Sequence, residues 1–168
     1  MKKLILGIPL SLMLFFSTNL SAQLAVGGGL TITTDSGFDR AGVAVRGVYS
    51  FNDNWRAGAS FNFPFPESYS NSFFGEEVKV RYFDFSADAN YVFAFKDDFS
   101  FYGLAGINYF SVSVKSNGGK SSASSTGLEL GGGAEWAFSD NLKAFGETKY
   151  VIGDADRFIL SVGVLYSF

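Results

Sequence analysis

The sequence predicts an all-β fold, an eight-stranded antiparallel up-and-down transmembrane β-barrel that follows an N-terminal signal peptide. Large apolar residues alternate with small or polar ones in eight segments, which is the period of a β-strand. The composition is 18% aromatic with 20 Phe and 20 Gly, which suits a surface that faces lipid. After residue 23 no apolar run is long enough for a membrane helix, so a membrane protein with this sequence must be a closed barrel.

The first 22 residues have the pattern of a secretory signal peptide. Lys2 and Lys3 are followed by the apolar run 4–16 and then by "STNLSAQ", which predicts cleavage near Ala22 or Gln23. The alternative is an N-terminal membrane anchor. Because the sequence contains no Cys, lipidation at a cysteine is excluded. The expected domains are therefore the signal peptide, 1–22, and the barrel, 23–168.

The expected strands are residues 24–32, 40–51, 55–65, 80–93, 99–114, 127–138, 142–152 and 158–168. The third is the clearest, since Trp55 and Phe61 alternate with Arg56 and Asn62. The phase of 99–114 is uncertain. In 142–152, which is also weakly patterned, Lys143, Phe145, Glu147 and Lys149 are assigned to the inside. An even number of strands of this length fits a bacterial outer-membrane barrel.

Short and long connections alternate along the chain. "FNDNW" (51–55), "FKDDF" (95–99) and "FSDNL" (138–142) are tight polar turns, whereas 66–78 and 115–126 are long and polar. Barrels of the outer membrane have short turns on the periplasmic side and longer loops outside. The expected aromatic girdle at the short-turn rim is Phe51, Trp55, Phe93, Phe99, Trp136, Phe138 and Tyr166. The Gly/Ser-rich segment 115–126 is predicted to be a mobile loop.

Charged residues fall mainly on the strand faces opposite the aromatic ones. The predicted interior polar network is Arg46, Arg56, Asp84, Asp88, Glu129, Glu135, Lys143, Glu147 and Lys149, with Arg40 and Arg157 also on the lumen side. An eight-stranded barrel has a lumen just wide enough for side chains. The network predicts either a plug of ion pairs or a narrow water-filled ion path. A soluble barrel such as a lipocalin, with apolar residues inside, is the competing architecture.

The segment "FILSVGVLYSF" (158–168) resembles the C-terminal signal of outer-membrane barrels. Leu160, Val162, Val164, Tyr166 and Phe168 match its alternating apolar pattern and terminal aromatic residue. The segment from residue 23 onward resembles the small OmpA/OmpX-like outer-membrane β-barrel family. The resemblance implies recognition by the barrel-assembly machinery and contact with outer-membrane lipid of a Gram-negative bacterium. The "SAQ" region is similar to signal peptides of the Bacteroidetes.

The sequence argues against an enzyme. Enzymatic outer-membrane barrels of similar architecture use a catalytic His, and this chain has none. A paired-carboxylate hydrolase remains as an alternative, but Asp84 and Asp88 lie about 13 Å apart along one strand. Glu129 and Glu135 are farther apart still. No metal, cofactor or phosphate-loop motif is present, and the "GGG" triplets at 27–29 and 131–133 are expected to relieve crowding.

The remaining candidates lie outside the membrane. Phe73, Phe74, Glu76 and Glu77 in the 66–78 loop could contact an extracellular protein partner, or the two Phe could pack locally. The net charge of −3, more negative once Lys2 and Lys3 are removed, excludes nucleic-acid binding. The predicted role is structural or surface-interacting, adhesin-like; the alternative is a narrow, non-selective pore for ions or small solutes.

Overall fold

The computed structural model describes residues 23–35, 38–65, 67–71, 76–116, 119–153 and 156–168. The predicted signal peptide and its alternative, a membrane anchor, therefore lie outside the described residues. The strands are β1 (Gln23–Asp35), β2 (Phe38–Ser50), β3 (Trp55–Pro64), β4 (Glu67–Asn71), β5 (Glu76–Lys96), β6 (Phe99–Ser116), β7 (Gly119–Ala137), β8 (Leu142–Ile152) and β9 (Arg157–Ser167). No helix within these ranges is long and apolar enough to span a membrane.

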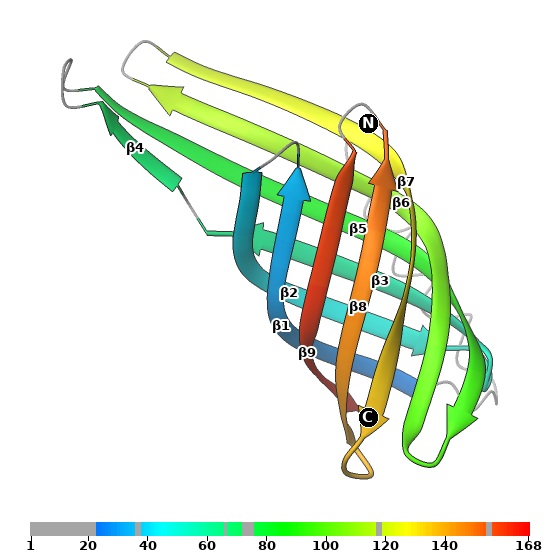
Figure 1. Ribbon diagram of the computed structural model, residues 1–168. Coiled ribbons are helices and arrows are strands. Elements are labelled where there is room, and N and C mark those ends of the chain that lie inside the picture. The colour runs from blue at the N-terminus through cyan, green and yellow to red at the C-terminus, as the bar shows by residue number, and fades with distance from the viewer. Residues whose placement is uncertain (1–22, 36–37, 66, 72–75, 117–118, 154–155) are drawn as a thin grey trace, which may run out of the picture.

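The strands form one closed antiparallel barrel (Figure 1). β1 pairs with β9, and β3 pairs with β5, so the sheet has no free edge around the barrel itself. β3 and β4 occupy one place in it, since both pair with β5 and their registers differ by one residue, from Asn62↔Asp84 to Glu67↔Val80. Pro64 ends β3, and a proline cannot donate a ladder hydrogen bond. The predicted eight-stranded barrel is confirmed, with one strand interrupted.

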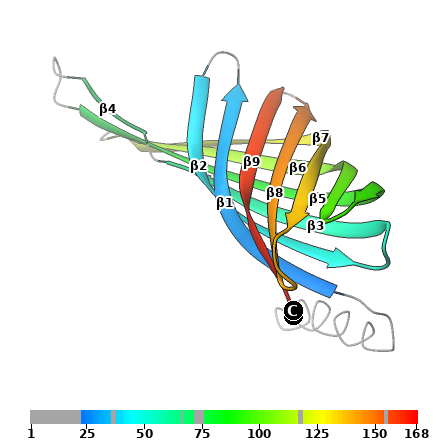
Figure 2. The ribbon, with the colours of Figure 1, turned by 60° about the horizontal axis from the view of Figure 1, so that its bottom comes forward.

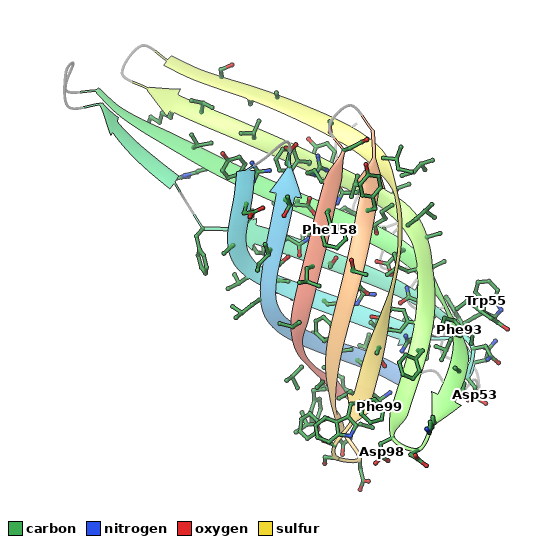
Figure 3. All side chains as sticks on the ribbon, viewed as in Figure 1. Asp53, Trp55, Phe93, Asp98, Phe99 and Phe158 are labelled. Atoms are coloured by element: carbon green, nitrogen blue, oxygen red, sulfur yellow. The ribbon has the colours of Figure 1, made fainter. Side chains whose placement is uncertain are left out.

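The three short connections lie together at one rim. They are residues 51–54, 97–98 and 138–141, as the repeated turn sequences predict. In the first turn the Trp55 backbone N–H donates to the Asn52 side-chain oxygen at 2.8 Å. In the second, Asp97 has a φ of 53°, a left-handed conformation that aspartate tolerates. Asp53 and Asp98 lie at this end of the molecule in Figure 3.

At the other rim β5, β6 and β7 extend far beyond their neighbours. β7 pairs with β8 only from Leu128 onward, so the part between Gly119 and Gly127 is paired with β6 alone. Together with β4, these extensions form a protruding sheet that leaves the barrel in a direction of its own (Figures 1 and 2).

The prediction of a mobile loop over 115–126 is wrong. β6 continues to Ser116 and β7 begins at Gly119, so 115–116 and 119–126 are paired strands, while 117–118 lie outside the described residues. Its Ser-rich strands have no apolar face and therefore give no alternation signal, yet the backbone ladder with β6 does not depend on side chains. In the 66–78 segment, 67–71 is strand β4 and β5 begins at Glu76, while 72–75 lie outside the described residues.

The barrel is apolar outside and polar inside. Leu128 is 63% exposed on the outer surface, whereas Glu129, the next residue, is fully buried in the lumen. This arrangement rules out the soluble, lipocalin-like alternative, which needs the reverse. It also settles the phase of β6, because Ile107 and Tyr109 face outward while Tyr102 and Asn108 face the lumen.

One bulge interrupts the regular alternation of β5. The register with β6 shifts between Val92 and Ala94, which leaves Phe93 without a direct partner. Beyond the shift Phe95 pairs with Ser100, and both line the lumen mouth at the short-turn rim. A strict period of two would have placed Phe95 on the lipid side, so the bulge determines where this ring lies.

Candidate functional site

The centre of the lumen holds a cluster of two cations and three carboxylates, Arg46, Lys149, Asp88, Glu129 and Glu147. Arg46 Nη2 lies 3.1 Å from Asp88 Oδ1 and 2.8 Å from Glu147 Oε2. Lys149 Nζ lies 3.0 Å from Asp88, 3.3 Å from Glu147 and 3.5 Å from Glu129. The five side chains come from β2, β5, β7 and β8. The cluster therefore ties separate parts of the barrel wall together.

Neutral polar residues complete the hydrogen bonding of this cluster. Ser86 donates to Glu129 Oε2 at 2.7 Å, Lys149 donates to Ser60 at 3.4 Å, and Asn90 accepts from Arg46 at 3.1 Å. Asn90 also donates to Asp88. A charge buried in a narrow lumen is tolerated when it is paired and hydrogen-bonded. Sequence reasoning selected only charged residues, although these polar ones share their strand faces.

Gly58 makes room for the central ion pair. It lies opposite Asp88 in the β3–β5 register, and a Cβ at this position would collide with Asp88 Oδ1 and Arg46 Nη2. Gly133, which lies closer to the short-turn rim, makes room for Tyr102 in the same way, because a Cβ there would collide with the Tyr102 ring. The lumen is therefore filled so closely that single methyl groups do not fit at these positions.

Between the central cluster and the short-turn rim, Arg56 and Tyr102 form a second layer. Arg56 Nη1 donates to both carboxylate oxygens of Glu135 at 2.8 Å, and its guanidinium carbon lies 4.6 Å from the centre of the Tyr102 ring. The Tyr102 hydroxyl donates to Glu147 Oε2 at 2.8 Å, which links this layer to the central cluster. The sequence pattern left Tyr102 unassigned because the phase of its strand was ambiguous.

On the other side of the central cluster, toward the protruding sheet, Asp84 accepts hydrogen bonds from side-chain amides. Asn62 and Asn108 each donate to its Oδ1 at 2.9 Å, and Arg157 lies 3.9 Å from its Oδ2. The Arg157 guanidinium carbon lies 4.3 Å from the centre of the Phe110 ring, and Arg157 Nη2 donates to Asn108 Oδ1 at 2.5 Å. This third layer lies toward the rim of the protruding sheet.

Arg40 and Tyr82 continue the upper layer toward the same rim. Arg40 lies 3.4 Å from Asp35, and its guanidinium carbon is 4.7 Å from the centre of the Tyr82 ring. Tyr82 in turn stacks on Phe110 with 6.1 Å between ring centres. The three layers together extend from Arg40, near the rim of the protruding sheet, to Arg56, which lines the mouth at the short-turn rim.

Lys143 differs from the other predicted network residues. It lines an open depression of about 440 Å³ at the short-turn mouth, together with Phe95 and Arg56, and makes no ion pair with any described residue. The depression is the mouth of the lumen. Within the described part of the chain, no group of three or more acidic, His or Cys residues is placed to hold a metal ion.

The other predicted residues lie away from the lumen. Leu160, Val162, Val164, Tyr166 and Phe168 all lie on the outer face of β9 and its end, and the Phe168 backbone N–H donates to Leu24 O at 3.0 Å. Phe73 and Phe74 lie outside the described residues. Glu76 and Glu77 are the first residues of β5, in register with Asn71 and Ser70 of β4.

The family model described as "Outer membrane protein beta-barrel domain" matches residues 8–168. The chain belongs to this family. The match includes every strand of the barrel and the whole charged lumen. This outer-membrane barrel therefore carries its apolar outer wall toward lipid, as its family and its inside-out burial require.

Solved structures with the same fold are distant in sequence. Ail, the attachment invasion locus protein of Yersinia pestis, is 20% identical with a TM-score of 0.64, covering 88% of this chain and 97% of that chain. The Neisserial surface protein A is 18% identical with a TM-score of 0.63, and the match covers 88% of this chain and 97% of that chain. The N-terminal barrel of Pseudomonas aeruginosa OprF is 17% identical with a TM-score of 0.63, and the match covers 89% of this chain and 98% of that chain. No curated protein matches the sequence.

Proposed function

We propose that this outer-membrane barrel is a non-conducting scaffold that presents its protruding sheet to partners outside the cell. The observation that carries the proposal is the extension of β5, β6 and β7 beyond the barrel while the lumen below them is occupied by paired charges. A plugged barrel has no transport path, so its accessible surface is the part outside the membrane. Among the described residues, the periplasmic side has three tight turns around the mouth of the lumen.

The contacts in the lumen support closure to ions. Three cations in the lumen are each paired with carboxylates at 2.8–3.5 Å: Arg46, Arg56 and Lys149. All three side chains are buried, so they do not line an open path for ions. Moving an ion through would require breaking several of these pairs at once, and a buried charge left without its partner costs about 3–5 kcal/mol. The competing proposal is a narrow, non-selective pore in which the pairs open transiently.

Single-channel recording of refolded residues 23–168 in a planar bilayer tests closure, with heat-modifiable gel mobility as the folding control. We expect no discrete openings from the wild-type barrel. A porin, whose lumen is a water-filled channel, is recorded in the same bilayer and shows that the assay detects an open barrel. Reproducible wild-type openings would establish the pore instead.

The same contacts support a non-catalytic role. Asp88, Glu129 and Glu147 approach one another from different strands, which spacing along one strand did not predict. Each is nevertheless buried and bound by Lys149, so none faces a substrate. A lipid or peptide turnover that disappears in Glu129→Gln, while the barrel stays folded, would contradict this role.

The protruding sheet has the features of a surface that accepts an extended protein segment. Among the described residues, 119–127 of β7 have a strand partner on one side only, and β4 pairs only with β5. An unpaired strand edge presents backbone donors and acceptors to another chain. Deletion of 67–77 should abolish binding to a host or matrix protein without unfolding the barrel. Retained binding would transfer the role to the β6–β7 hairpin, which a deletion of 116–121 tests separately.

A row of lysines favours an anionic ligand as a second candidate. Lys79 of β5 is in register with Lys115 of β6, and Lys115 is in register with Lys120 of β7. The register thus brings three lysine positions together on neighbouring strands, and a basic patch favours a bound polyanion. The Yersinia pestis Ail structure contains a heparin analogue, sucrose octasulfate. We expect salt-sensitive binding of sulfated glycan that Lys115→Gln weakens and Lys96→Gln, at the opposite rim, leaves unchanged.

Export and assembly complete the proposal. Cleavage near Ala22 or Gln23 is tested by the mass of the N-terminal peptide of the exported protein. Recognition of Leu160, Val162, Val164, Tyr166 and Phe168 by the barrel-assembly machinery is supported by their common outward face on the last strand. An origin in the Bacteroidetes remains a prediction from the "SAQ" region alone.

A further inference from the structure

The lipid-facing wall of the barrel contains a hollow of about 420 Å³ near the short-turn rim. Its floor is formed by small residues, Ala89, Gly103 and Ala105. Its sides are formed by large ones, Trp55, Tyr91, Phe93 and Leu130. Figure 3 shows Trp55 and Phe93 side by side at this end of the barrel, pointing away from it.

The sheet register explains why the hollow lies here. Across β3, β5 and β6, Trp55 pairs with Tyr91 and Tyr91 pairs with Gly103, so a row of aromatic rings stops abruptly at a glycine. The next row runs Ala89↔Ala105 and then reaches Leu130 on β7. Two adjacent rows therefore lack large side chains at the same place.

Contacts among the aromatic residues fix one side of the hollow. The Trp55 and Tyr91 ring centres are 5.0 Å apart. The bulge in β5 leaves the Phe93 side chain 64% exposed beside them. Aromatic residues at this height mark the membrane–water boundary of an outer-membrane barrel.

We propose that this hollow binds one acyl chain of a phospholipid of the inner, periplasmic leaflet. The hollow lies in the continuous apolar surface that contacts the bilayer, and its floor offers no polar side chain. A void in this surface would forfeit dispersion contacts on both the protein and the lipid side, so a chain that fills it is retained longer than its neighbours. The short turns place it in the periplasmic leaflet, where phospholipid rather than lipopolysaccharide supplies the chains.

The two tryptophans of the chain provide the test. Trp136→Phe leaves Trp55, in the hollow, as the only tryptophan, and Trp55→Phe leaves Trp136, which packs on Phe99 with 6.0 Å between ring centres. Each variant is refolded into vesicles that contain a small mole fraction of brominated phosphatidylcholine. We expect Trp55 to be quenched more than Trp136 at the same mole fraction of brominated lipid, because a chain held in the hollow lies against Trp55.

Filling the hollow provides the decisive comparison. In the Trp136→Phe background, Ala105→Leu should remove the excess quenching of Trp55, whereas Ala41→Leu, at a lipid-facing position on β2, should retain it. Equal quenching of both tryptophans, or excess quenching that survives Ala105→Leu, would overturn the proposal. Excess quenching that falls as the protein-to-lipid ratio rises would also overturn it, because a second barrel would then displace the chain. The test reports on lipid alone and is independent of lumen closure and of the extracellular partner.

Discussion

Arg46 of β2 and Glu147 of β8 meet inside the barrel, with 2.8 Å between Nη2 and Oε2 and only 2% of each side chain exposed. The two strands are separated in the sheet by β1 and β9. Their contact therefore spans the lumen instead of following a hydrogen-bonded ladder. Arg46 also binds Asp88 of β5, so one guanidinium connects three parts of the wall.

Arg46→Ala should strongly destabilise the barrel. Lys149 would then be the remaining cation paired with Asp88 and Glu147. Breaking a buried ion pair costs about 3–5 kcal/mol. Equilibrium urea unfolding in lipid vesicles measures the loss. The matched control is Arg81→Ala, since Arg81 is exposed, and a surface change of this kind shifts stability by about 0.5 kcal/mol or less. Equal losses for both variants would show that the cluster contributes nothing.

Tyr102→Phe isolates the hydrogen bond between the second layer and the centre. The ring under Arg56 remains, but the donor to Glu147 is lost, and hydrogen bonds to charged groups contribute about 1.5–3 kcal/mol. Unfolding in the same vesicles should show a loss in this range. Tyr109→Phe, on the outward face of the same strand, is the control and should be near neutral. A neutral Tyr102→Phe would mean that Glu147 is satisfied by Arg46 and Lys149 alone.

Gly58→Ala tests how tightly the lumen is filled. The added methyl group would collide with the Asp88 and Arg46 side chains, and overpacking a filled interior costs about 1–3 kcal/mol. Gly47→Ala on β2 is the matched control, because a Cβ there meets no atom within 4 Å. Both variants are compared by urea midpoint. If the two midpoints shift equally, the lumen has more free space than the packing around Asp88 implies.

Phe168→Ala should impair assembly more than stability. The residue is 74% exposed, so it contributes little packing within the barrel, but it completes the outward pattern of β9. We expect less heat-modifiable protein in the outer membrane of expressing cells and unchanged refolding into vesicles. Phe158→Ala, on the same face at the opposite end of the strand, should assemble normally. Normal assembly of Phe168→Ala would remove the proposed role of the C-terminal signal.

The barrel could be predicted from the sequence because lipid and a narrow polar lumen impose opposite requirements on alternate residues. Trp55, Phe61 and Phe63 must face one side if Arg56 and Asn62 face the other, and the structure has this arrangement. The choice of ionic partners could not be predicted in this way. Arg46 faces the same lumen as every lumen carboxylate, and only the stagger of the strands brings it to Asp88 and Glu147.

Three local features also escaped the pattern, each for a physical reason. The bulge at Phe93 adds one residue to β5, and no residue type signals it, so the inward position of Phe95 was unexpected. Strand pairing in 119–127 relies on backbone hydrogen bonds to β6. The Ser-rich composition of this segment instead predicts a loop. The hollow beside Trp55 arises from small residues on separate strands, so it becomes visible only once the register is known.

The pairing of β1 with β9 has a consequence for how the protein is made. Thr31 and Ser161 bond across this seam although they are 130 positions apart in the chain. The cylinder cannot close until its last strand has been synthesised, and contacts between such distant residues form slowly. Until that strand is in place, the apolar outer faces of β1 and β9 are exposed without the ladder that joins them in the finished barrel.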